Sequence, residues 1–117
     1  MSEADILVFP TKGEFLKEKM TNLARWVTQE VGEENLPVDV FTGIADRSVV
    51  EVTALSGALD ANNTLVTTRN WSGLVQLMNE HGAVRELQEV VVAVQRRPEM
   101  HDKFWRYMNL FIEVARQ

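Results

Sequence analysis

Apolar residues in the first third of the chain recur at the spacing of a helix. The positions that share one helical face are Leu16, Met20, Leu23, Val27 and Val31. A spacing of three or four residues places such side chains on a single side of an α-helix. Thr11-Lys-Gly-Glu14 directly precedes them and has the pattern of a capping box, while Gly32 is a typical residue at a helix end. The pattern predicts a helix from residue 11 to residue 31.

Residues 32–47 carry the signals of a loop. They contain three turn-forming residues, Gly32, Pro37 and Gly43, together with several acids. Within this loop, the run from Val38 to Phe41 is the one segment that suits a short extended piece.

Residues 48–59 fit two kinds of element. Ser48-Val-Val-Glu51 has the pattern of a second capping box, which favours a helix. The β-branched run from Ser48 to Thr53 is also typical of a strand. We predict the helix. Asp60-Ala-Asn-Asn63 then indicates a turn, and Leu65 to Thr68 is predicted to be an extended connector.

The last third of the chain is predicted to hold three helices. The first covers residues 70–81, and Gly82 after it suits a left-handed helix cap. Residues 83–97 contain no Gly, Pro, Asn, Asp or Ser, so we predict a second helix there despite their valines. Pro98 suits the first turn of the third helix, over 98–114.

Together these elements predict a mostly α fold, a compact bundle of about five helices in a single domain over residues 1–117. Short extended segments are expected near the N-terminus, at Asp5 to Phe9, and in mid-chain. The alternative is an α+β fold with a small sheet. It stays open because the valine-rich runs within 48–59 and 89–95 also have strand character.

The composition narrows the class of protein. The chain has 117 residues, of which 45% are hydrophobic and 25% charged, as in an ordinary globular domain. It has no cysteine, which excludes disulfides, Cys-ligated zinc, iron–sulfur clusters and thiol nucleophiles. Its apolar stretches are far shorter than the roughly 20 residues that span a bilayer. The acidic start of the chain is unlike a targeting peptide, so we expect a cytoplasmic protein.

Charge is distributed unevenly, with a formal total of −5. Residues 1–60 carry a net −6 and residues 61–117 a net +1. This balance disfavours a general binder of nucleic acid, which relies on clustered Lys and Arg. One acidic cluster suits a basic partner, although exposed acids most often form a solvated face. Its members are Glu30, Glu33, Glu34 and Asp39.

Candidate catalytic groups are few. No serine lies in a nucleophile-elbow pattern, and the glycines are isolated, so no phosphate-binding loop is present. Glu80-His81 and His101-Asp102 are the best candidate metal ligands, but two histidines without i, i+4 spacing carry little specificity. We therefore predict no catalytic residue, no metal site and no cofactor.

The sequence helix, Gly82, helix is also typical of a helix-turn-helix motif. Its recognition helix would be 83–97, with Arg85, Arg96 and Arg97 as contacts to DNA. The start of that helix is apolar, whereas base edges are read by polar side chains. This pattern is kept as an alternative.

The last predicted helix has the most unusual pattern. A narrow polar stripe leaves an apolar arc about twice that of an ordinary surface helix. One interpretation is a central helix packed on several sides. The other is that its outer side docks a second copy or another partner, since interfaces favour Trp, Tyr and Met. The residues predicted to form this interface are Phe104, Trp105, Tyr107, Met108, Phe111 and Ile112.

By elimination, the sequence predicts a non-enzymatic protein–protein interaction domain: a self-associating adaptor, a chaperone-like accessory factor or an inhibitor that blocks a surface. The expected partner is another protein, a second copy or both, with no nucleic acid and no membrane. A helix-turn-helix DNA-binding regulator and a small ligand- or metal-binding helical enzyme are the alternatives.

Overall fold

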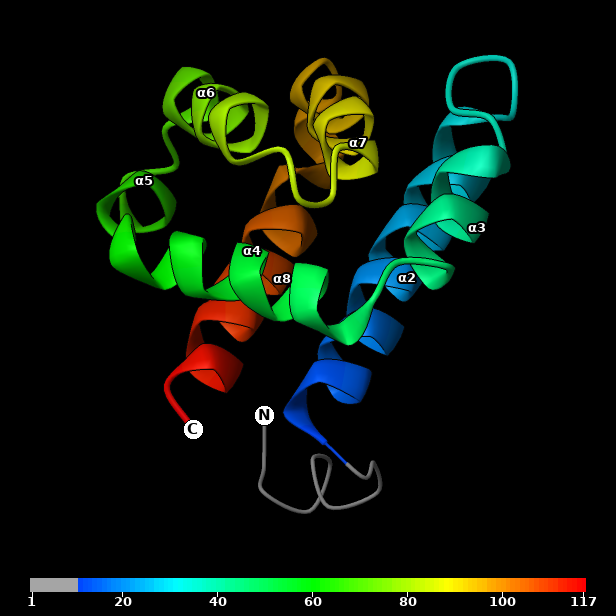
Figure 1. The fold of residues 1–117 in the computed structure, drawn as a ribbon. Helices are drawn as coiled ribbons and strands as arrows, with labels where there is room; N and C mark the ends of the chain where they lie inside the picture. Colours follow the sequence, from blue (N-terminus) through cyan, green and yellow to red (C-terminus); the bar gives the residue numbers. More distant parts are fainter. Residues whose placement is uncertain (1–10) are drawn as a thin grey trace.

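The last helix of the chain, α8 (His101–Ala115), lies in the middle of the fold, in contact with helices from every other part of the chain. Figure 1 shows the computed structural model, which describes residues 11–117, with α8 passing behind α4. Helices account for 78% of these residues and no strand occurs among them. The mostly α class is therefore confirmed. Residues 11–117 form seven α-helices, where about five were predicted.

The longest helix is α2 (Lys12–Val31), which agrees closely with the prediction for this segment. The Thr11 side chain accepts a hydrogen bond from the Glu14 amide at 3.1 Å. At the other end, Gly32 has a φ of 87° and its N–H donates to the Thr28 carbonyl. Both ends are thus set by residues that the sequence pattern singled out.

Two segments predicted to be extended are helical instead. Val38 to Phe41 belongs to the start of α3 (Asp39–Ala45), and Leu65 to Thr68 overlaps the short helix α5 (Thr64–Thr67). Each helix turns apolar side chains into the core, Val40 and Ile44 from α3 and Val66 from α5. Burial of these side chains outweighs a strand propensity that is worth at most about 1 kcal/mol. The segment Asp5 to Phe9 lies outside the described residues.

The ambiguous segment 48–59 is helical, as predicted, and forms α4 (Val49–Ala61). Its capping box is complete: the Ser48 hydroxyl accepts from the Glu51 amide at 3.1 Å, and the Ser48 amide donates to the Glu51 carboxylate at 3.4 Å. The helix packs across α8, where the Ser56 hydroxyl donates to the Phe111 carbonyl at 2.5 Å. A small residue at position 56 lets the two helices approach closely.

The predicted helix 70–81 is confirmed as α6 (Trp71–His81), and Gly82 caps it in the left-handed region with a φ of 68°. The helix predicted over 83–97 is shorter, since α7 covers only Glu86–Gln95. Residues 83–85 form a turn that buries Val84, so the chain bends there without any special turn residue. Pro98 opens a 3₁₀ turn, η1 (Pro98–Met100), that runs directly into α8.

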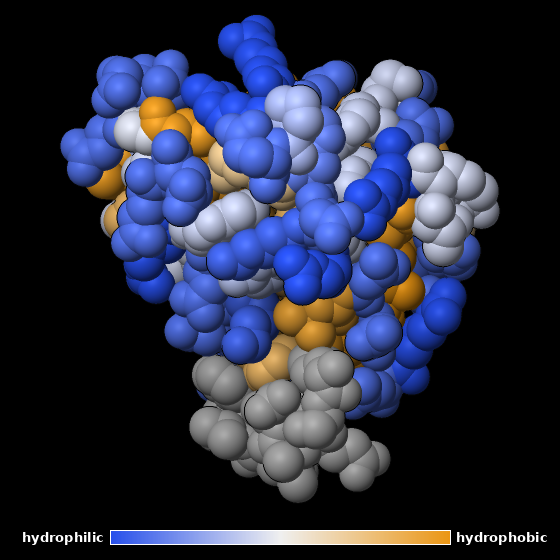
Figure 2. Space-filling view, turned by 180° about the vertical axis from the view of Figure 1, so that it is seen from behind, coloured by the Kyte–Doolittle hydropathy of each residue, from blue (hydrophilic) through white to orange (hydrophobic). Residues whose placement is uncertain are grey.

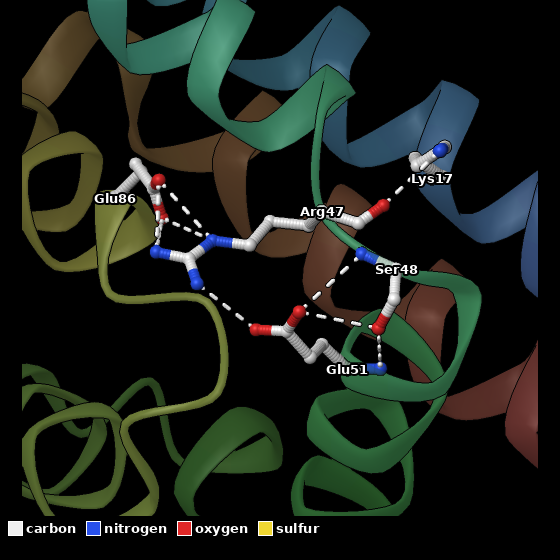
Figure 3. A network of polar contacts seen from close by, with 5 residues as sticks. All are labelled: Lys17, Arg47, Ser48, Glu51 and Glu86. Carbon is white, nitrogen blue, oxygen red and sulfur yellow. Dashed lines mark hydrogen bonds and ion pairs between the residues drawn. The ribbon is translucent and has the colours of Figure 1, made fainter.

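One polar network ties the α3–α4 loop to α7 (Figure 3). The Arg47 guanidinium forms two-pronged contacts with the Glu86 carboxylate at 2.9–3.2 Å and a further bond to Glu51 at 2.9 Å. Lys17 of α2 donates to the Arg47 carbonyl at 3.1 Å. The hydrogen bonds that Arg47 donates to Glu86 raise the pKa of Arg47 above its usual value. Because the carboxylates of Glu51 and Glu86 both accept hydrogen bonds from Arg47, the network connects helices. It leaves neither carboxylate of this network free for acid–base catalysis.

Candidate functional site

Most of the interface predicted on the C-terminal helix is core. Five of its six residues are at most 5% exposed, because α2, α4, α5 and α7 surround α8. These five are Phe104, Trp105, Met108, Phe111 and Ile112. Only Tyr107 reaches the surface, half-buried. The wide apolar arc thus belongs to a central helix, and the predicted contact surface is corrected to the edge of α8 that carries Tyr107.

No broad apolar surface replaces the one that the core has absorbed. Among the described residues, the exposed large apolar side chains are Val38, Val50 and Val92, on three separate elements. Figure 2 shows hydrophobic residues in small patches separated by hydrophilic side chains. Scattered apolar residues of this kind are normal on a soluble protein. The described helices therefore present no large exposed apolar surface for binding a partner.

A groove beside α8 gathers the side chains best suited to binding. It has a volume of about 480 Å³ and is widely open to solvent. It is lined by Lys19 of α2 and by Lys103, Arg106, Tyr107 and Leu110 of α8. The four α8 residues fall on one side of that helix, at intervals of three to four. Three cations thus meet an aromatic ring and an aliphatic side chain, with no acid among the lining residues.

Aromatic rings hold two of these cations. The ammonium of Lys103 lies 4.5 Å from the centre of the Trp26 ring, and that of Lys19 lies 5.3 Å from the Phe15 ring. Trp26 is in turn stacked on Tyr107, with ring centres 6.4 Å apart. Cation–π contacts of this kind restrict long side chains without neutralising them. The charges at the groove are therefore positioned before any ligand arrives.

The groove cations have no counter-ion within the described part of the chain. The ion pairs there involve Arg47, Arg69 and Arg116, all outside the groove. Burial raises the pKa of the Tyr107 hydroxyl, so this group stays neutral and keeps its proton at physiological pH. The groove therefore offers donors and positive charge beside an apolar wall.

Searches against protein-family models, curated proteins and solved structures find no significant match to this chain. Its function is therefore inferred from its own geometry.

The acidic cluster is exposed, as expected of a solvated face. Glu30 lies in the last turn of α2, Glu33 and Glu34 follow in the loop, and Asp39 begins α3. No basic side chain of the described residues forms an ion pair with any of the four. The cluster remains a second candidate contact surface, of opposite sign to the groove.

The two histidines occupy separate structural positions. His81 is exposed in the last turn of α6, next to the cap at Gly82. The His101 Nε2 atom lies 3.0 Å from the Val94 carbonyl and 3.1 Å from that of Gln95, and its ring rests against Trp71. Within residues 11–117 no group of three or more His, Asp or Glu side chains is arranged to hold a metal.

The helix-turn-helix alternative rests on α6 and α7, but the cations it needs are dispersed. Arg85 precedes α7, whereas Arg96 and Arg97 follow it, about 16 Å along the helix axis. The guanidinium of Arg97 donates to the Ala93 carbonyl at 2.7 Å. The exposed side of α7 between them carries Glu89 and Val92, an acid and a valine where phosphates and base edges would lie.

None of the described helices is both long and apolar enough to cross a bilayer.

Four of the five residues that line the groove were missed by the sequence pattern: Lys19, Lys103, Arg106 and Leu110. A signal for half of the site existed, because Phe15, Lys19 and Trp26 repeat on one helical side. The other half lies more than seventy residues away in the chain. Only the packing of α2 beside α8 brings the two halves together.

Proposed function

We propose that this chain is a non-enzymatic protein-interaction domain that binds a partner through the groove between α2 and α8. The observation that carries the proposal is a set of cations around Tyr107 and Leu110 that form no ion pair with any of residues 11–117. Interface cores favour Tyr, Trp and Arg, since such residues combine apolar area with hydrogen-bonding ends. The groove presents Tyr107 and Arg106, and Trp26 is stacked against Tyr107.

The shape of the groove favours a macromolecular partner over a small ligand. Small-molecule sites bury 70–90% or more of the ligand surface in a concave pocket. This groove is shallow, widely open to solvent and lined by only five residues, so it would cover only one side of a bound segment. An extended or helical segment of another protein suits such a channel, because the rest of its surface can contact the flanking helices.

Site-specific photo-crosslinking in cells tests the proposal. A photoreactive phenylalanine analogue replaces Arg106, which is exposed at the groove, and in a second strain Gln76, which is exposed on α6. We expect a discrete adduct, heavier than the 13.3 kDa chain, from position 106 only. The adduct should vanish when Leu110→Asp is added, because a carboxylate in the apolar wall disfavours docking.

The control variant for that step is Val50→Asp. It introduces the same charge on α4 at a side chain that is 76% exposed and outside the groove. The adduct should persist in Val50→Asp. Absence of an adduct at position 106, or equal adducts at both positions, contradicts the proposal. An adduct of twice the chain mass identifies the partner as a second copy.

A further inference from the structure

The charge of the groove points to the chemistry of its occupant. Resting on the proposed function above, we infer that the groove binds a short acidic segment of another protein, with two or three carboxylates placed around one apolar side chain. The carboxylates would meet Lys19, Lys103 and Arg106, and the apolar side chain would lie against Tyr107 and Leu110. No acid among the lining residues competes for these cations.

Charge complementarity is strengthened by the way the cations are held. Lys103 and Lys19 rest on aromatic rings, so their side chains have already lost part of their rotamer freedom. Binding a carboxylate therefore costs less side-chain entropy. Arg106 adds a planar fork that fits a carboxylate with two parallel hydrogen bonds. Since the cations have no partner among residues 11–117, binding replaces water without breaking an existing ion pair.

The limited extent of the positive surface favours a short segment over a long polyanion. The molecule measures 35 × 28 × 25 Å and carries a formal −5. Duplex DNA presents one negative charge per about 1.7 Å of its axis. Beyond the three groove cations, such a polymer would run over a predominantly acidic protein and be repelled. A membrane of anionic lipid would meet the same repulsion across its plane.

Retention of defined peptide pools on the immobilised full chain tests this inference. One pool contains peptides of about 12 residues with three Glu residues at random positions among Ala, Leu, Phe and Ser, and the matched pool has Gln in place of Glu. We expect the acidic pool to be retained about fivefold more strongly, and this preference to disappear at high salt. Equal retention of the two pools overturns the inference.

Variants of the groove locate the binding. Lys103→Gln and Arg106→Gln keep part of each aliphatic stem and remove the charge, and each should lower retention of the acidic pool about threefold or more. Arg85→Gln and Arg96→Gln remove exposed charges elsewhere and should change nothing. Unaltered thermal unfolding shows that each variant folds. Equal losses in both pairs of variants overturn the inference.

The remaining occupants are separated by further probes. The two probes are a single-stranded DNA of about 12 nucleotides and phosphatidylserine vesicles. If either is retained as strongly as the acidic pool, with the same dependence on Lys103 and Arg106, the occupant is that polyanion and the inference of an acidic protein segment is overturned. A crosslink at position 106 without preference for the acidic pool leaves the proposed function standing and removes this inference. A preference for the acidic pool without any crosslink shows only that the groove binds acidic peptides in vitro; it removes the proposed function, and with it the inferred protein partner.

Discussion

Replacing Trp105 by alanine should destabilise the protein without changing its assembly. The side chain is 1% exposed and packs on Trp71, with ring centres 4.6 Å apart, and on Phe104 at 5.3 Å. An aromatic side chain buries about 200 Å², which at about 25 cal/mol per Å² corresponds to about 5 kcal/mol. Alanine keeps a small part of that burial, and truncations of buried Trp cost about 3 to 5 kcal/mol.

The indole nitrogen moves this expectation to the lower end of the range. Nε1 of Trp105 is buried without a hydrogen-bond partner, and such a donor costs about 1 to 3 kcal/mol. The alanine variant removes that penalty together with the packing, so we expect a loss of about 3 kcal/mol. Trp105→Phe also removes the donor while keeping a six-membered ring, so its stability should stay within about 1 kcal/mol of the wild type.

Urea unfolding followed by far-ultraviolet circular dichroism measures these differences, since helix content reports unfolding independently of the removed indole. A loss of about 3 kcal/mol lowers the melting temperature by roughly 10 °C in a chain of this length. Arg106→Ala on the same helix is the control and should change stability by about 0.5 kcal/mol or less. The molar mass from light scattering should be the same for the wild type and Trp105→Ala.

Two results would refute this reasoning. One is a loss below about 1 kcal/mol for Trp105→Ala, which would mean that the site is not tightly packed. The other is a wild-type dimer that Trp105→Ala converts into folded monomers, which would place the indole at an interface between copies.

Three further predictions follow from local features of the structure. Gly57→Ala should stabilise α4 by about 0.5 to 1 kcal/mol, because a Cβ there meets no atom within 4 Å, whereas Gly82→Ala should cost about 1 to 2 kcal/mol because φ is 68°; urea unfolding of the two variants checks the opposite signs. The Ser48 amide, and then the Arg47 guanidinium, hold the pKa of Glu51 below its usual 4.5. The resulting stability is present above pH 4.5 and is lost as the pH falls through the lower pKa of the folded state, so Glu51→Gln should show a weaker acid dependence of the urea midpoint than the wild type. Tyr107 is the only tyrosine of the chain, and absorbance titration should give it a pKa above 10.0; folding stability should decline as the pH rises through 10, where the unfolded chain ionises first. A midpoint at or below 10.0 in the folded protein would contradict the burial of its hydroxyl.

Local sequence determined where the main helices begin and end. Thr11 and Ser48 accept the amide hydrogen bonds that open α2 and α4, and Gly82 ends α6 in a conformation that few other residues adopt easily. These interactions involve residues at most four positions apart, so a pattern in the chain is enough to predict them. The valine-rich α7 was predicted as a helix for the same reason, because it lacks turn formers.

Tertiary packing decided what propensity left open. Val40 in α3 and Val66 in α5 are helical because a helical turn buries them, and that burial depends on neighbours that are distant in the chain. Helical periodicity shows that α8 is apolar on several sides, but it does not show whether other helices of this chain or a separate partner cover those sides. α2, α4, α5 and α7 cover them, and so Trp105 is core.

The candidate groove was decided by packing alone. Lys19 and Lys103 belong to helices near opposite ends of the chain, and neither stands out as a binding residue in its own segment. They become a site because α2 lies beside α8. This packing sets Lys103 over the ring of Trp26 and brings it next to Lys19, which rests on Phe15 of its own helix. Helix formation depends on contacts within a few residues, whereas a binding surface depends on which helix faces are left over once the core is filled, and that is a property of the whole fold.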